Sequence, residues 1–359
     1  MASIARVCRR GGYMKLKDLQ ELAKELDTQD MVGYTRKFID DFEQAIAKNI
    51  DIDVDKDWSG VLCLGMGGSG AGGMFLSTLA DYSGGIPFVV WRDYNLPSWW
   101  GPDWLILATS YSGNTEETID GVREALESGG TVIGISSGGE LEDIIAENQE
   151  SLFISVPGGQ MPRSAFGHLF GSQISVCWSL GIIEKPNSEE ISNMIERLRS
   201  SSMDFDISGG NGLVLSVAES ILNKEIGIIA PTIMMPAARR FANQLNENSE
   251  VFARPSELPE MNHNEIIAWS SSNADKHSII YFSCENIHPR INSRMNWMLE
   301  NIDNNHSWII DCEGHSLLES LLYASHISDW ISIALALIKG IDPSDINSIV
   351  DLKSHLSNN

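Results

Sequence analysis

Short apolar segments alternate with amphipathic stretches from about residue 60 to residue 155. The short segments predict buried strands at 61–64, 88–91, 105–108, 132–135 and 152–155. The stretches between them predict helices at 71–82, 116–127 and 141–148, after a polar helical lead-in that runs to about Lys48. This rhythm is typical of a parallel sheet that is covered by helices on both faces.

The rhythm breaks at Pro186-Asn187-Ser188 and then restarts. The second half predicts strands at 212–216, 226–230, 278–282 and 308–311, and helices at 236–246, 290–300 and 317–339. We therefore expect an α/β protein with a lead-in at 1–40, a first domain at 41–186 and a second domain at 187–359. The two domains share a plan, although no strong residue-level repeat is visible.

The net charge of −24, from 49 acidic against 25 basic residues, changes which partners we expect. Such a surface repels nucleic acid and anionic lipid, and an anionic substrate must be held by local donors. The apolar run 330–338 is too short to span a membrane. Five scattered cysteines without metal spacing indicate a reduced, cytoplasmic protein, and the arginine-rich residues 1–13 precede no apolar signal segment.

The first predicted strand ends in a glycine-rich turn, Gly65-Met-Gly-Gly-Ser-Gly70, and a helix follows it. Small residues let the backbone approach an anion, and a helix N-terminus offers free N–H donors. The spacing also fits a dinucleotide-binding fingerprint with Asp93 after the next strand, so a nicotinamide cofactor is an alternative at this point. A tight turn without any ligand is a third interpretation.

A second polar turn favours a phosphate over a dinucleotide. Ser110, Ser112 and Thr115 place three hydroxyls in six residues after the strand at 105–108. Thr115 can serve as the N-cap of the following helix, but capping does not explain the two serines. Neutral hydroxyls beside helix N-termini suit a phosphate monoester in an acidic protein, and a dinucleotide fold needs no such turn.

The two turns together resemble the phosphate-binding loops of the sugar isomerase (SIS) domain family. Three later segments narrow the resemblance: MPRSAFG at 161–167, NQLNEN at 243–248 and EMNHN at 260–264. Their order and spacing resemble the bifunctional phosphoglucose/phosphomannose isomerases, best known from archaea, from about residue 40 to the end. The resemblance implies two SIS-type domains, each a parallel sheet flanked by helices on both faces.

The resemblance also implies roles for single residues. The substrate phosphate would be held by Gly67, Gly68, Ser69, Ser110, Ser112 and Thr115. Arg163 would lie over C1 and C2, Glu247 would be the base, and His263 of a partner subunit would assist ring opening. In the last long helix the match is looser: Ser332 would face C2 and Lys339 would reach substrate oxygens, although a helix C-terminus favours a cation without any substrate.

The implied reaction interconverts glucose 6-phosphate and mannose 6-phosphate with fructose 6-phosphate through a cis-enediol, without metal or cofactor. A carboxylate can carry the proton, a guanidinium can stabilise the enediolate, and an imidazole titrates near neutrality. Singly, Glu247, Arg163 and His263 each have a structural explanation. Their joint occurrence in family order favours catalysis.

The expected partners are a hexose 6-phosphate and a second copy in a homodimer with a shared site, in the cytoplasm, acting in glycolysis and gluconeogenesis. The eight histidines form no HxH or HExxH cluster, which disfavours a zinc-dependent isomerase. The rival function is a non-catalytic SIS-type regulatory protein that binds sugar phosphate. Such a protein keeps both turns and can lose Glu247, Arg163 or His263, all of which are present.

Overall fold

The computed structural model describes residues 15–48, 50, 52, 56–271, 276–285, 287–302, 307–312 and 314–356, and the arginine-rich segment with Cys8 lies outside this range. The chain forms two compact units, which we describe separately. The central unit is Arg36–Arg199. The terminal unit combines Ser200–Asn359 with the residues up to Thr35.

The central unit contains a parallel five-stranded sheet in the order β2-β1-β3-β4-β5. Its strands are β1 Gly60–Leu64, β2 Phe88–Trp91, β3 Trp104–Thr109, β4 Val132–Ser136 and β5 Leu152–Ser155. All five coincide with predicted strands. The three inner strands are almost fully buried, as their continuous apolar sequences require.

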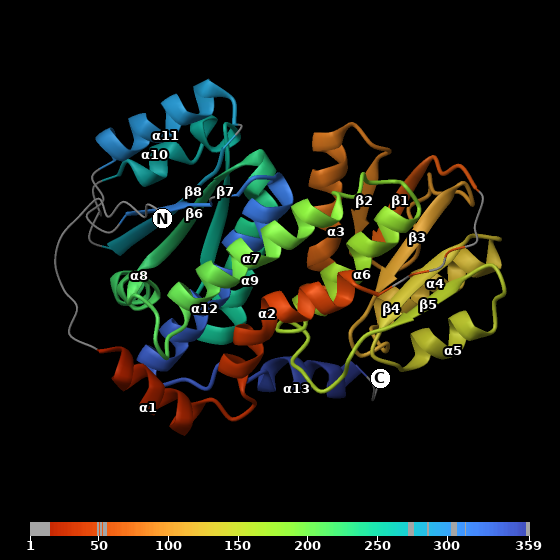
Figure 1. The fold of residues 1–359 in the computed structure, drawn as a ribbon, viewed down its shortest axis with the longest axis horizontal. Coiled ribbons are helices and arrows are strands. Elements are labelled where there is room, and N and C mark those ends of the chain that lie inside the picture. The colour runs from red at the N-terminus through yellow and green to blue at the C-terminus, as the bar shows by residue number, and fades with distance from the viewer. Residues whose placement is uncertain are drawn as a thin grey trace. The chain divides into compact units, whose positions relative to one another are not determined.

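Helices cover both faces of this sheet (Figure 1). They are α3 Gly67–Ser83, α4 Glu116–Glu127, α5 Glu140–Ala146 and α6 Phe166–Ser179. The chain moves one way along the sheet from β1 to β2 and the other way from β3 to β5. Right-handed crossovers therefore place α3 and α4 on opposite faces. The α3 face is filled by Phe75, Phe166 and Phe170, whose ring centroids lie 5.1–5.4 Å apart.

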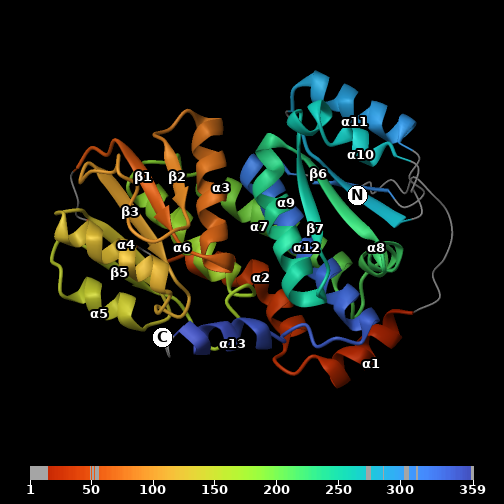
Figure 2. The same ribbon diagram turned by 180° about the vertical axis from the view of Figure 1, so that it is seen from behind.

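The terminal unit contains a parallel four-stranded sheet in the order β7-β6-β8-β9, the same plan as β2-β1-β3-β4. Its strands are β6 Glu225–Pro231, β7 Ala253–Leu258, β8 His277–Ser283 and β9 Trp308–Asp311. The helices α8 Leu213–Ile221, α9 Met235–Ser249 and α12 Leu317–Lys339 pack together, and α10 Ile266–Trp269 lies beside α11 Pro289–Asn301 (Figure 2). The remaining elements are α1 Leu16–Leu26, α2 Met31–Ile46, α7 Ser188–Phe205, η1 Thr232–Met234, η2 Glu260–His263 and α13 Asn347–Leu356.

Helix α12 is long and apolar enough to cross a membrane, a property that the short apolar run 330–338 had not suggested. Its most apolar window is 94% buried inside the structure. Contacts with α9, α8 and α1 account for this burial. The helix therefore serves as the apolar centre of the terminal unit.

Residues 212–216, predicted as a strand, instead begin helix α8. The prediction used only the first apolar residues of the segment. Over the whole element the buried positions are Val214, Leu215, Val217, Ala218 and Ile221, which recur at helical spacing. The apolar stripe therefore faces α12 as one side of a helix.

The domain boundary differs from the expected one after residue 186. The amide oxygen of Asn187 accepts hydrogen bonds from the N–H groups of Glu189 and Glu190 at 3.0 Å, and Glu190 accepts one from the Asn187 N–H at 2.9 Å. These reciprocal contacts are a capping box, so this polar segment starts α7 rather than a linker. The division falls later, after Arg199, and the lead-in up to Thr35 belongs to the terminal unit, where α1 contacts α12.

Candidate active site

The two polar turns lie at the C-terminal ends of β1 and β3, which are adjacent strands at the centre of the sheet. From these two strands the chain continues to helices on opposite faces. Such a point, where the strand order reverses, is where parallel α/β sheets bind ligands, because the departing connections leave a crevice. The fold therefore brings the two turns together at a natural ligand position.

The glycine turn is tighter than predicted, because α3 begins at Gly67 rather than near residue 71. Gly67, Gly68 and Ser69 therefore form its first turn, and their N–H groups lie among those that a helix leaves without a partner from within the helix. Gly67 has a φ of +51°, and no atom lies within 4 Å of the position that a Cβ would take. Backbone donors at a helix N-terminus thus adjoin open space, as anion binding requires.

The hydroxyls of the second turn contact one another. Ser110 Oγ lies 2.7 Å from Thr115 Oγ1, and the Thr115 N–H donates to Ser110 Oγ at 3.4 Å. Thr115 precedes α4, but its side chain makes no capping hydrogen bond, so the capping role is not used. Ser69 Oγ from the first turn accepts the Tyr111 N–H at 3.0 Å.

Ser112 lies differently from the other predicted hydroxyls. It is exposed, and its Oγ accepts the N–H of Asn114 at 3.2 Å within the turn. The Ser112 hydroxyl can still donate a proton outward, because accepting one bond leaves its O–H available. Ser69 and Ser110 therefore form the buried part of the cluster, Thr115 is half-buried, and Ser112 lies at its solvent side.

The turn before α6 brings Arg163 to the glycine turn. A Cβ added to Gly68 would lie 3.0 Å from the Arg163 Cα and 3.2 Å from its backbone nitrogen, so a larger residue would have to push this backbone away by a few tenths of an ångström. The Arg163 residue is 3% exposed. The fold thus brings the Arg163 backbone to the glycine turn, and a guanidinium at such a turn can stabilise negative charge that develops on a bound sugar phosphate.

Sequence reasoning missed a second cation beside this site. Arg92 follows β2 directly, and its Nη2 donates to the Gly70 carbonyl at 3.4 Å. Asp93, the residue that suggested a dinucleotide, accepts the N–H of Tyr94 at 2.8 Å in a local turn. The signal that could have identified Arg92 is its position at a strand C-terminus next to the glycine turn.

The predicted proton-transfer residues lie in the terminal unit. Glu247 is half-buried near the C-terminal end of α9, and His263 is exposed at the end of η2. Glu247 has at least one polar or electrostatic interaction in the structure. We predict that these two residues share one active site with the hydroxyls of the central unit, and this stays a prediction.

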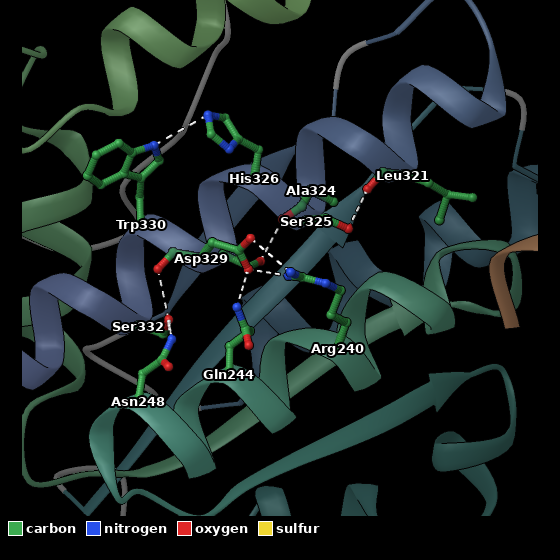
Figure 3. A network of polar contacts seen from close by, with 11 residues as sticks. Arg240, Gln244, Asn248, Leu321, Ala324, Ser325, His326, Asp329, Trp330 and Ser332 are labelled. Atoms are coloured by element: carbon green, nitrogen blue, oxygen red, sulfur yellow. Dashed lines mark hydrogen bonds and ion pairs between the residues drawn. The ribbon is translucent and has the colours of Figure 1, made fainter. Parts of the chain in front are cut away.

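Ser332 and Lys339 make internal contacts in the structure, and the substrate contacts expected from the sequence stay a prediction. Ser332 is fully buried, and its hydroxyl accepts from Asn248 Nδ2 at 2.8 Å and donates to the Asp329 carbonyl at 2.8 Å (Figure 3). Lys339 Nζ donates to the backbone carbonyl of Ser249 and, at 3.2 Å, to that of Glu250. The ammonium therefore caps the C-terminus of α9, where the helix dipole favours a cation.

Among the described residues, no group of three or more His, Cys, Asp and Glu side chains could hold a metal ion. The four described cysteines are free and buried. Burial raises the pKa of Cys63 to about 12. Thiolate chemistry at that residue is therefore unfavourable near neutral pH.

Comparison with known proteins gives agreement in sequence over most of the chain. A family model described as the bacterial phospho-glucose isomerase C-terminal SIS domain matches residues 214–356. A bifunctional phosphoglucose/phosphomannose isomerase from Thermoplasma acidophilum is 30% identical over 302 residues, which are 84% of this chain and 90% of that protein. A D-glucosamine-6-phosphate 4-epimerase from Sulfolobus acidocaldarius is 32% identical over 241 residues, which are 66% of this chain and 71% of that protein.

Solved structures agree in fold. A hypothetical protein from Thermus thermophilus superposes with a TM-score of 0.71 at 12% identity, covering 95% of this chain and 93% of that chain. At this identity the likeness concerns architecture alone. It agrees with an α/β protein built from two parallel sheets, as the sequence predicted.

Proposed function

Because this chain belongs to the bifunctional phosphoglucose/phosphomannose isomerase family, we propose that it interconverts glucose 6-phosphate and mannose 6-phosphate with fructose 6-phosphate. The observation that carries this proposal is the 30% identity that extends over 90% of a protein with that name. Agreement over both halves of the chain favours an enzyme over a regulatory module that has kept only the phosphate turns.

The hydroxyl cluster supports phosphate binding in the central unit. Ser69, Ser110 and Thr115 offer O–H donors next to the first turns of α3 and α4. The chain carries a net charge of −24, so a dianionic substrate needs such local donors. Arg92 and Arg163 add positive charge beside the same turn. These groups would fix the phosphate end and leave the carbonyl end of the sugar near Arg163.

Glu247 is our proposed base. Isomerisation moves a proton between C2 and C1, so one carboxylate can remove it from one carbon and return it to the other. The enediolate formed in between carries negative charge on oxygen, and the guanidinium of Arg163 would stabilise that charge. Since hexose phosphates are mostly cyclic, His263 would transfer the proton that opens the ring.

The assembly and the setting of this reaction are also proposals. We infer a homodimer in which His263 acts in the site of the other subunit, because the resemblance implies a shared site. The reaction would belong to glycolysis and gluconeogenesis in the cytoplasm, and the scattered, free cysteines are compatible with a reducing compartment. No metal or cofactor enters this mechanism.

The decisive experiment measures loss of the C2 proton of glucose 6-phosphate to deuterated solvent by NMR, with EDTA present. The wild-type protein should exchange this proton, and Glu247→Gln should reduce the rate by about 10²-fold or more because an amide cannot accept it. Sugar-phosphate binding, followed by calorimetry, should be nearly unchanged. Glu300→Gln, an exposed carboxylate on α11, is the matched control and should keep the wild-type rate. Exchange by Glu247→Gln at the wild-type rate would assign the base elsewhere.

Epimerisation of a hexosamine phosphate at C4 is the second candidate, because the Sulfolobus relative is 32% identical over 241 residues. The same NMR assay distinguishes it when glucosamine 6-phosphate is the substrate. A new 4-epimer with no ketose product would favour that activity. Conversion of glucose 6-phosphate and mannose 6-phosphate to fructose 6-phosphate would favour isomerisation.

A further inference from the structure

A cavity of about 400 Å³ opens on the terminal unit between α11 and the segment formed by η2 and α10. It is lined by Asn262, Ile266, Arg290, Ser293, Arg294 and Trp297. Four of these residues follow one another at helical spacing on α11, so one face of that helix forms a wall. The cavity belongs to neither of the polar turns described above, which lie in the central unit. Its size is that of a pocket for a small metabolite.

The cavity is positively charged in a strongly acidic protein. Arg290 and Arg294 lie one helical turn apart, and the ion pairs found in the described part of the chain include neither of them. Nearby carboxylates are engaged elsewhere: Glu265 accepts from Arg254 Nε at 2.8 Å, and Glu260 accepts from Asn264 Nδ2 at 3.0 Å. The two guanidinium charges are therefore left for an anion.

Asn262 holds one of the arginines at the cavity wall. Its Oδ1 accepts from Arg294 Nη1 at 3.3 Å, and its Nδ2 lies 3.2 Å from the sulfur atoms of Met261 and Met298. Both methionines are buried, so Asn262 connects the guanidinium of Arg294 to the core of the unit. A guanidinium with fewer free orientations loses less entropy when it binds an anion, and its planar fork matches phosphate.

Two of the lining residues are apolar. Trp297 is 50% exposed and Ile266 is half-buried, so both present apolar surface without being covered. An indole offers a flat face on which a planar ring can stack. A ligand that uses both kinds of lining residue joins a phosphate to a planar ring.

We propose that this cavity binds a nucleoside monophosphate, with its phosphate on Arg290 and Arg294 and its base on Trp297. The affinity for the nucleotide should depend on both guanidinium groups and on the indole. Substrate sugar phosphates, which lack a planar ring, should bind this cavity more weakly than the nucleotide.

The test is isothermal titration of the full-length protein with AMP, and separately with inorganic phosphate and fructose 6-phosphate. AMP should show saturable binding, and Arg294→Gln and Arg290→Gln should each weaken it by about tenfold, the usual effect of losing a charged hydrogen bond. Trp297→Gln should bring AMP affinity down to that of inorganic phosphate. Ser110→Ala should leave AMP binding unchanged while it weakens fructose 6-phosphate binding.

The matched control is Arg239→Gln, which removes an exposed arginine on α9 that does not line the cavity. If Arg239→Gln weakens AMP binding as much as Arg294→Gln, the effect is one of net charge and the proposal is wrong. It is also wrong if AMP gives no saturable binding, or if fructose 6-phosphate displaces AMP completely. Circular dichroism of each variant separates loss of the cavity from loss of the fold.

Discussion

The guanidinium of Arg240 and the carboxylate of Asp329 form a buried ion pair between α9 and α12 (Figure 3). Arg240 Nη2 donates to Asp329 Oδ2 at 2.9 Å, and Gln244 Nε2 donates to Oδ1 at 2.7 Å. Burial raises the pKa of Asp329, and the positive charge of Arg240 opposes this rise. Since α9 also carries Glu247, the pair fixes the helix that presents the proposed base.

We expect Arg240→Met to destabilise the protein by about 3–5 kcal/mol, because it leaves the Asp329 charge buried without its partner. Arg240→Met combined with Asp329→Asn should recover most of that loss, since Asn carries no charge and can still accept from Gln244. Urea unfolding at neutral pH measures both. Equal stability of the single and double variants would show that the unpaired charge is not the cause.

His326 is a buried histidine held in its neutral form. Its Nε2 lies 2.8 Å from Ser202 Oγ and accepts from Trp330 Nε1 at 3.3 Å. Burial, with a smaller contribution from the positive charge of Arg240, lowers the pKa of His326 from 6.5 to about 3. Below about pH 6.5, His326 is therefore protonated in the unfolded chain but stays neutral in the folded chain.

The stability that depends on neutral His326 is present above pH 6.5 and is lost as the pH falls towards 3. The loss should be about 1.4 kcal/mol per pH unit, or about 2 kcal/mol at about pH 5. His326→Gln removes this titration, so the stability difference between wild type and variant should shrink on acidification. Urea unfolding of both proteins at about pH 7 and pH 5 tests it, and a constant difference would mean that His326 titrates normally.

The contacts of a polar side chain follow from the sequence where its partner is local, and they do not where the partner lies on a distant element. Ser110 and Thr115 are close in sequence, and their contact follows from one turn. The hydroxyl of Ser332 accepts a hydrogen bond from Asn248, which lies on another helix. The sequence supplied a hydroxyl at that position, but only packing of α9 on α12 shows that it is used internally.

At the scale of elements, helices and strands with a strong apolar periodicity were predicted correctly. Elements with a weak or mixed pattern were not. Strand β7 escaped prediction because its sequence, ARPSEL, contains Pro255 and charged residues. The strand pairs only with β6, and an edge strand tolerates a proline that a central strand does not. Alternating burial of Ser256 and Leu258 shows the period of two that the polar residues concealed.

The start of α3 gives an element-level prediction about the site. Gly67 has a φ of +51° with open space around its Cβ position, whereas a Cβ at Gly68 would press on the Arg163 backbone. Gly67→Ala should therefore cost about 1–2 kcal/mol of stability through strain. Its methyl group would also enter the open space beside the N–H donors, so it should raise KM more than it lowers kcat. Gly68→Ala should displace the turn that carries Arg163 and lower kcat more strongly.

Thermal unfolding and steady-state assays on the two alanine variants separate strain from displacement. The pair is matched, because the residues are adjacent and the added group is the same. Rescue of Gly68→Ala is not expected from higher substrate concentration, since Arg163 acts on the developing charge rather than on ground-state binding. An equal fall of kcat in both variants would contradict the link between Gly68 and Arg163.

At the scale of the whole molecule, the repeated plan of two parallel sheets was predictable, because buried parallel strands are continuous apolar runs. The strand orders β2-β1-β3-β4 and β7-β6-β8-β9 correspond. The division of the chain was less predictable. Residues up to Thr35 belong to the terminal unit because α1 contacts α12. The local sequence pattern of α1 does not predict this contact.

The net charge of −24 leads to a prediction about ionic strength. A dianionic sugar phosphate is repelled at long range and attracted only near the polar turns. The Debye length falls from about 30 Å at 0.01 M salt to about 8 Å at 0.15 M, so added salt should screen the repulsion before it screens the local contacts. We expect kcat/KM for glucose 6-phosphate to rise over this range, with kcat almost unchanged. The same trend should appear with sodium chloride and sodium acetate but not with sucrose of equal osmolarity. A fall of kcat/KM with salt would show that Arg92, Arg163 and the helix N-termini dominate the approach, so that the acidic surface has no part in substrate capture.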